Sequence, residues 1–161
     1  NESPLIFYPV ILGLSRLEAS LTSIDSIITQ LPQLCSLNIS DCPNLCTLAP
    51  LAKYNVTSKF MDSIEEQRTL SLRHLWVRGC NLSNMSRSEW SAVFDALSRS
   101  SGPLERMTLS RNRLSYLDGG IGKLKCLSYL FVEDNYFVGE GGGSAFDLPD
   151  ELGCKCFFAY V

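Results

Sequence analysis

Apolar and polar positions alternate in the same way twice between residues 104 and 137. The two copies, 104–114 and 127–137, lie 23 residues apart and both read L-x-x-L-x-L-x-x-N-x-L, where L is any large apolar residue. The matching positions are Leu104, Met107, Leu109, Asn112 and Leu114 in the first copy and Leu127, Leu130, Val132, Asn135 and Phe137 in the second. The alternation predicts a short strand in each copy, with apolar side chains on one face and the intervening residues on the other.

Three weaker copies precede these two. Residues 34–45 carry the pattern with Cys42 at the Asn position, and residues 72–82 carry it with Cys80 there. Residues 14–24 match more poorly, because two of the five positions deviate. We therefore expect five strand-bearing coils, near residues 14–24, 34–45, 72–82, 104–114 and 127–137.

This pattern and its spacing resemble the leucine-rich repeat family, which accepts Asn or Cys after the strand. The resemblance implies an α/β fold: a leucine-rich repeat solenoid with short parallel strands on the concave face and helices and irregular turns on the convex face. It also implies that the Asn and Cys side chains bond backbone groups of neighbouring coils. No coil can bury its leucines alone, so the coils are expected to stack into a single domain over residues 1–161.

The uneven spacing of the strands means that the longer gaps hold extra structure. Between residues 81 and 103, Ser86 and Glu89 form a capping-box sequence, a run of apolar residues at helical spacing follows, and Gly102 comes after it. This predicts an amphipathic helix on the convex side, as in the ribonuclease-inhibitor-like branch of the family. Residues 48–67 give a looser signal, which favours a helix or an insertion.

Both ends of the chain depart from the repeat. The apolar run 5–14 contains Pro9 and is shorter than the roughly 20 residues that span a membrane, so we expect a capping strand or first coil there. Residues 138–161 are expected to form a glycine-rich loop and a C-terminal cap. A short array without polar end-caps favours a truncated piece of a larger protein, or a subunit packed against partners.

Composition and charge argue against nucleic acid as a partner. The net charge is -3 and the 14 basic residues are scattered rather than clustered, whereas phosphate backbones require grouped Lys and Arg. The glycine-rich run 139–146 lacks the Lys-Ser or Lys-Thr of a phosphate-binding loop, so we expect it to be a flexible loop.

The seven cysteines bear on the cellular compartment. An odd count with irregular spacing is poor support for a disulfide framework, and Cys42, Cys80 and Cys126 are expected to be small buried residues. Cys154 and Cys156 would suit the cysteine-rich cap of secreted family members, and four N-x-S/T sequons also favour secretion. The balance favours an intracellular, reduced protein over a secreted one.

Metal, cofactor and catalytic sites are not expected. The two close cysteine pairs lie far apart in the chain and have unusual spacing for zinc. The chain has one histidine, His74, and none of the nucleophile-elbow, zincin, P-loop or kinase motifs. Serines are plentiful, but the sequence places no base beside any of them. His74 falls on an outward strand position next to Trp76, which favours a surface contact residue over a catalytic one.

The concave face remains as the candidate site. Outward positions flank and separate the last two strand leucines of each copy. They are Arg16, Glu18 and Ser20; Ser36, Asn38 and Ser40; His74, Trp76 and Arg78; Arg106, Thr108 and Ser110; Tyr129, Phe131 and Glu133. The first two coils present small or polar residues there, whereas the last three gather aromatic rings and arginines. The residues predicted to bind a partner are His74, Trp76, Arg78, Arg106, Thr108, Tyr129, Phe131 and Glu133.

Strand spacing suggests that these side chains act together. Neighbouring strands lie about 4.8 Å apart, so Trp76 and Phe131 should lie within roughly 10 Å of each other, with Thr108 between them. Aromatic residues with arginine are typical of binding hot spots, and large apolar side chains exposed together indicate an interface. The alternative is that another segment of the chain covers them.

These features favour a non-catalytic module that binds another protein through its concave face. The family includes inhibitors, adaptors, ubiquitin-ligase substrate receptors and immune sensors, and the resemblance does not choose among them. Two alternatives stay open. One is a structural subunit of a large assembly, held by its ends and convex side. The other is a fragment of an extracellular receptor, which would carry glycans and no free thiols. Neither nucleic-acid binding nor membrane insertion is expected.

Overall fold

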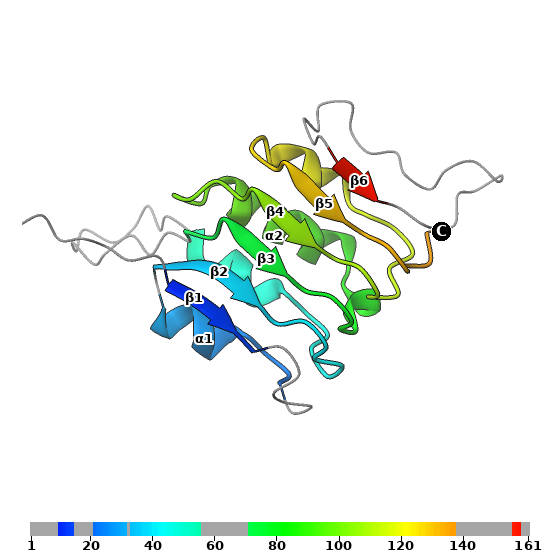
Figure 1. Cartoon of the computed structure of the whole chain (residues 1–161), viewed down its shortest axis with the longest axis horizontal. Coiled ribbons are helices and arrows are strands. Elements are labelled where there is room, and N and C mark those ends of the chain that lie inside the picture. The colour runs from blue at the N-terminus through cyan, green and yellow to red at the C-terminus, as the bar shows by residue number, and fades with distance from the viewer. Residues whose placement is uncertain (1–9, 15–20, 32, 56–70, 138–155, 159–161) are drawn as a thin grey trace, which may run out of the picture.

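The computed structural model describes residues 10–14, 21–31, 33–55, 71–137 and 156–158. These residues form a parallel sheet of six strands, and the order of the strands in space follows their order in the sequence (Figure 1). The strands are β1 (Val10–Gly13), β2 (Leu34–Asn38), β3 (His74–Trp76), β4 (Arg106–Thr108), β5 (Tyr129–Phe131) and β6 (Cys156–Phe158). The predicted α/β class is confirmed.

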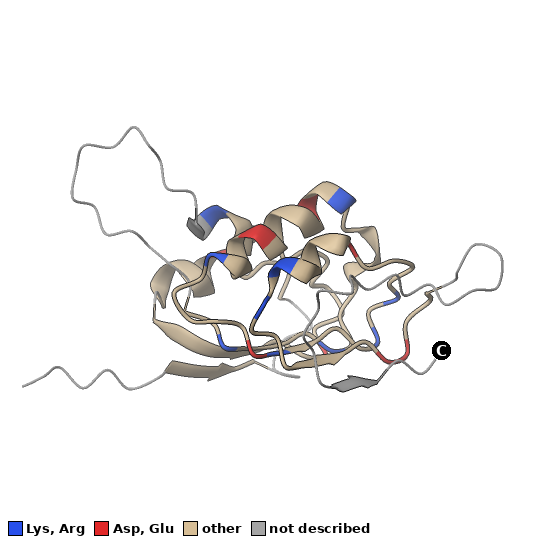
Figure 2. Cartoon of the chain, turned by 90° about the horizontal axis from the view of Figure 1, so that it is seen from above, with Lys and Arg blue, Asp and Glu red and all other residues tan. Residues whose placement is uncertain are grey.

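The helical segments and the sheet form two layers (Figure 2). The segments are the α-helices α1 (Asp25–Gln30) and α2 (Arg87–Ser98) and the 3₁₀ helices η1 (Ala49–Asn55), η2 (Leu82–Asn84) and η3 (Gly119–Lys123). α2 packs between η1 and η3, and its Trp90 and Phe94 rings stack with centroids 5.4 Å apart. Within the described ranges, no helix covers the opposite side of the sheet, which we call the open face.

The apolar positions of the repeat meet in one core between the two layers. Leu37, Leu75, Met107 and Leu130 are direct partners on neighbouring strands, and all four are fully buried. Each lies between two less buried residues of its own strand, except in β2, where Ser36 is also buried. The period-two alternation in the sequence therefore separates a core side from an open side, and β2 to β5 lie within the last four predicted copies.

The first strand lies upstream of its predicted copy at residues 14–24. β1 belongs to the apolar run 5–14, where a capping strand or first coil was expected, and Leu12 rather than Leu17 is the partner of Leu37. The reason is that Val10 and Leu12 pack against the core, whereas the 14–24 segment matches the repeat poorly. Arg16, Glu18 and Ser20, which were expected on the concave face, lie outside the described residues.

The C-terminal region continues the sheet beyond the repeats. Phe157 of β6 is the direct partner of Leu130 of β5, so part of the expected loop and cap at 138–161 is a sixth parallel strand. The remainder of that segment lies outside the described residues. In the 48–67 gap, η1 is a short 3₁₀ helix, and the expected helix or insertion beyond it also lies outside them.

α2 begins at the predicted capping box. The Ser86 amide donates to Glu89 Oε2 at 2.8 Å, and the Glu89 amide donates to Ser86 Oγ at 3.3 Å. The bond from the Ser86 backbone is the main reason that the pKa of Glu89 lies below its ordinary value. Past the helix, Gly102 packs so tightly against the carbonyl group of Ser71 that a Cβ atom there would overlap it, so only glycine fits.

Buried asparagines join the last coils to one another. The Asn112 side chain donates to the backbone carbonyls of Val77 and Leu109, and its Oδ1 accepts from the Cys80 amide at 3.1 Å. Asn135 repeats the arrangement one coil later, because its Oδ1 accepts from the Asn112 amide at 3.0 Å and its Nδ2 donates to the Leu109 carbonyl. Each asparagine therefore satisfies buried backbone groups of the preceding coil.

Cysteines take the same position in the earlier coils. Cys80 Sγ lies 3.2 Å from the Ile39 carbonyl oxygen, and Cys42 Sγ lies 3.8 Å from that of Leu14. Burial raises the pKa of the Cys80 thiol to about 11, so at neutral pH it stays protonated and donates. Cys126 differs from the prediction, because it is exposed rather than buried; it follows η3 at a turn and points away from the core.

Candidate functional site

The strand register sets side chains of the open face in two rows across β2 to β5. The strand register places Ser36, His74, Arg106 and Tyr129 in the first row and Asn38, Trp76, Thr108 and Phe131 in the second. Thr108 is thus the direct neighbour of both Trp76 and Phe131, which agrees with the spacing predicted from the sequence. In β3, β4 and β5, which have three residues each, the first and third residues are the outward positions, and they recur in the same place from one strand to the next.

Six of these residues form what we call the open-face patch: His74, Trp76, Arg106, Thr108, Tyr129 and Phe131. The rings of His74 and Trp76 lie 5.3 Å apart between centroids and are tilted by 47°. The guanidinium carbon of Arg106 lies 4.6 Å from the centroid of the Tyr129 ring, within the range of a cation–π interaction. Tyr129 is 36% exposed, and Trp76 and Phe131 are partly exposed. The patch therefore offers aromatic surface to solvent.

The His74 ring has polar neighbours on both sides. Its Nδ1 lies 2.9 Å from Ser36 Oγ, and its Nε2 lies 4.0 Å from Glu105 Oε2. Glu105 also pairs with Arg73 through a distance of 3.4 Å between Nη1 and Oε1. The hydrogen bond with Ser36 therefore orients the ring that packs against Trp76.

Ser36, His74 and Glu105 are neighbours and have the residue types of a hydrolase triad. A nucleophilic serine needs an accessible hydroxyl and donors for the oxyanion that forms on attack. Ser36 is only 4% exposed, so a substrate carbonyl does not reach its hydroxyl without rearrangement of the sheet. The geometry fits better with a polar support for His74.

Two serines that were expected to point outward are buried. Ser36 is shielded in the row beside His74, and Ser110 is 2% exposed. Among the described residues, the Ser110 hydroxyl has no hydrogen-bond partner. A serine side chain is short, so longer neighbours shield it from solvent. Arg78 and Glu133 take the position of Ser110 in the coils before and after it. Arg78 is exposed, and Glu133 is partly exposed.

Sequence reasoning missed a recurring backbone feature at the end of the strands. The residue before each Asn or Cys of the ladder has a left-handed conformation: Asp41 (φ 58°), Gly79 (φ 66°), Arg111 (φ 60°) and Asp134 (φ 53°). Side chains other than glycine rarely adopt this conformation, which marks a turn fixed by its surroundings. The only signal in the sequence was that three of the four residues are Asp or Gly, which tolerate it best.

Other kinds of site find little support in the described ranges. No helix there is long and apolar enough to cross a membrane. Nor do three His, Cys, Asp or Glu side chains gather there in a group that could hold a metal ion.

Comparisons with known proteins add no relatives. No protein-family model matches the chain, and no curated protein or solved structure matches it. Family, function and partners therefore have to be inferred from the residues themselves.

Proposed function

We propose that this chain is a leucine-rich repeat module, a solenoid whose strands line a concave face, and that it binds another protein through this face without catalysis. Three features support the family assignment. The apolar positions of four copies share one core, ladder side chains bond the preceding coil, and helices lie on the other side of the sheet. A coil with these features is stable only against neighbours, as in repeat proteins.

The observation that carries the binding proposal is the open-face patch. Aromatic rings and an arginine lie side by side on a sheet face that no described helix covers. Tryptophan, tyrosine and arginine are the residues most enriched in binding hot spots, and exposed aromatic groups usually mark an interface. A partner is the simplest reason for Trp76 to stand where Asn38 serves the neighbouring strand.

Rigidity of the patch favours affinity. Its residues stand on hydrogen-bonded strands, and a hydrogen bond with Ser36 orients the His74 ring. Side chains that are ordered before binding lose less conformational entropy in the complex. The proposed contact residues are the eight predicted from the sequence, with Arg78 and Glu133 at the polar border of the patch.

We also propose that the protein is intracellular. Five cysteines of the described residues are present as reduced thiols, namely Cys35, Cys42, Cys46, Cys80 and Cys126. Two of them serve as hydrogen-bond donors in the ladder, where oxidation would remove the donor. Reducing compartments preserve such thiols.

The test starts by capturing a partner on the immobilised chain, identifying it by mass spectrometry and measuring the Kd of the purified pair. Trp76→Ala should weaken binding by about 2 kcal/mol, or roughly 30-fold in Kd, as central aromatic anchors do. Its free energy of unfolding should change by only about 0.5 kcal/mol, as for a surface position. Phe131→Ala should behave in the same way.

Arg99→Ala is the matched control, because Arg99 is exposed at the end of α2 on the helical side. It should change neither binding nor stability. A large loss of stability in Trp76→Ala with unchanged Kd would contradict the proposal, because it would mean that the protein's own chain covers Trp76.

A further inference from the structure

A hollow lies beyond the strand ends, next to the open-face patch. Its volume is about 460 Å³, and we call it the rim hollow. Its lining includes Asp41, Gly79, Arg111, Arg113, Asp134 and Tyr136. Four of these are the left-handed residues that precede the ladder positions, so the same backbone turn in four successive coils builds its floor.

Gly79 keeps the hollow open between the coils. A Cβ atom at this position would lie 2.7 Å from Asp41 Oδ1, and its φ of +66° is also unfavourable for other residues. The floor at this coil is therefore bare backbone, while charged side chains stand on the coils to either side.

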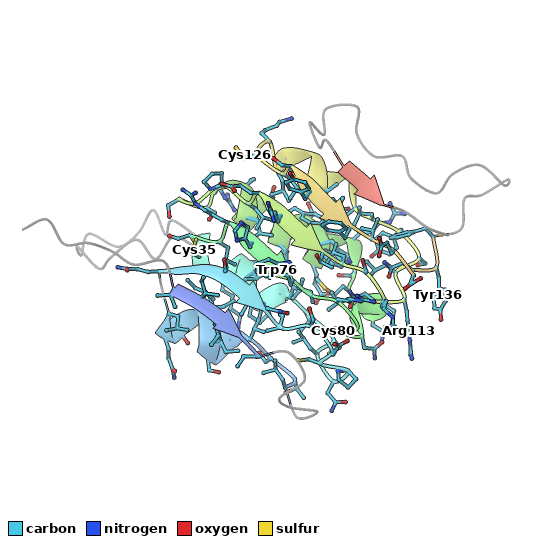
Figure 3. All side chains as sticks on the ribbon, viewed as in Figure 1. Cys35, Trp76, Cys80, Arg113, Cys126 and Tyr136 are labelled. Carbon is cyan, nitrogen blue, oxygen red and sulfur yellow. The ribbon has the colours of Figure 1, made fainter. Side chains whose placement is uncertain are left out.

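The charged side chains that line the rim hollow are those of Arg111, Arg113, Asp41 and Asp134. Arg111 Nε lies 3.9 Å from Asp134 Oδ2, and both side chains are more than half exposed. Arg113 is also exposed, and the described residues include no ion pair or hydrogen bond of its guanidinium. Tyr136, 63% exposed, lies at the same edge of the molecule (Figure 3). Among the described residues Arg113 has no carboxylate partner, and Tyr136 shares the lining with it. A guanidinium group of this kind suits an anion with planar geometry.

The rim hollow is continuous with the patch along one strand. Trp76 ends β3, Arg78 follows on the same face two residues later, and Gly79 and Cys80 line the hollow. At about 3.3 Å per residue, an extended segment seated on Trp76 reaches the hollow within about three residues. It passes exposed Arg78 on the way.

We propose that the rim hollow is a carboxylate subsite for the partner, so that the open face recognises a segment with an apolar anchor followed by an acidic group. Arg113 is the main residue that binds the carboxylate, and Arg111 is a second hydrogen-bond donor to it. The inference rests on the proposed function, because the apolar anchor lies on the patch. The carboxylate belongs to an Asp or Glu side chain or to a chain terminus, which have the same chemistry. Asp41 repels it from the far wall and so fixes its direction.

The probe is a random peptide library selected on the whole protein, with binders resynthesised both as free acids and as C-terminal amides. We expect selected sequences to pair an aromatic or large apolar residue with an acidic group a few positions away. Arg113→Gln should weaken these peptides at least about tenfold, as loss of one charge-assisted hydrogen bond implies. If the C-terminal amide binds more weakly than the free acid, the carboxylate that binds is that of the chain terminus. If both forms bind equally well, it is that of an Asp or Glu side chain.

Asp134→Asn is a gain-of-function test. It removes a negative charge and releases Arg111, while asparagine keeps the left-handed turn, so acidic peptides should bind about two- to threefold more tightly. A purely structural role of this region does not predict tighter binding. Arg99→Gln is the control for a lost arginine far from the hollow and should leave Kd unchanged. Arg113→Asn, which suits the positive φ of 58°, replaces Arg113→Gln if that variant melts early.

The outcomes separate this inference from the proposed function. If Trp76→Ala abolishes peptide binding while Arg113→Gln has no effect, the patch binds and the carboxylate subsite is wrong. If Arg113→Gln weakens binding while Trp76→Ala does not, the hollow binds carboxylates and the role of the patch is wrong. Absence of any binder, or binders without acidic groups, also overturns the inference.

Discussion

A single buried residue, Asn112, joins three consecutive coils through its side chain and its backbone amide. Its side chain bonds the Val77 carbonyl and the Cys80 amide in the coil before, and its own amide donates to Asn135 in the coil after. Asn112→Ala removes the side-chain half of this set and leaves buried backbone groups unpaired. We expect a loss of about 1 to 3 kcal/mol in the free energy of unfolding, measured by urea denaturation.

Asn84→Ala is the comparison, because Asn84 is exposed in η2. This variant should stay within about 0.5 kcal/mol of the wild type. Equal, small changes in both variants would mean that the ladder bonds contribute nothing net to stability.

Individual residues differ in how far the sequence predicts them. The ladder amides and the outward aromatic residues followed from position in the repeat, because period-two alternation and the turn repeated in each copy determine which way each side chain points. The burial of Ser110 and the left-handed backbone of Arg111 did not follow. Both depend on side-chain lengths and hydrogen bonds in neighbouring coils, which the local pattern does not contain.

Among the elements, α2 has an N-terminus whose stability depends on pH. The lowered pKa of Glu89 means that its carboxylate stabilises the folded state above its ordinary pKa of 4.5 and that this stabilisation is lost as the pH falls through the lowered value. Ser86→Ala removes the cap and should cost about 1 kcal/mol at neutral pH. Glu89→Gln should flatten the fall of stability below about pH 4.5, which urea unfolding at several pH values will measure.

The capping prediction has a clear negative outcome. If Glu89→Gln and the wild type lose stability in parallel on acidification, the acid sensitivity arises elsewhere, and the bond between Ser86 and Glu89 has no role in it. Ser115→Ala is the control for loss of a hydroxyl, because Ser115 is exposed and lies outside the capping box.

Elements were easier to predict where the sequence carried two independent signals. α2 had both a capping box and helical spacing, and β2 to β5 had both alternation and a repeat. β1 had only an apolar run that fits several registers, and the nearby leucines of 14–24 favoured the wrong one. Pairing with β2 selects Leu12, and only a neighbouring strand supplies that information.

At the scale of the whole molecule, the thiols test the proposed compartment. The unfolded, unreduced protein should react with a thiol reagent at close to seven cysteines. In the folded protein, exposed Cys46 and Cys126 should react first, whereas buried Cys42 and Cys80 should react slowly. The pKa of about 11 at Cys80 leaves little thiolate at neutral pH. Three or fewer reactive thiols after unfolding would contradict an intracellular protein.

The repeated backbone bonds make the array extensible. The Tyr129 amide donates to the Glu105 carbonyl just as the Arg106 amide donates to the Arg73 carbonyl, and the same equivalence holds at the strand ends for Leu109 with Phe131 and for Val77 with Thr108. A gene duplication of the 23-residue unit 104–126 would present every donor and acceptor that its neighbours already use. Evolution can thus lengthen the open face by one row of side chains at a time, and the new row is free to diverge because the backbone bonds do not depend on it.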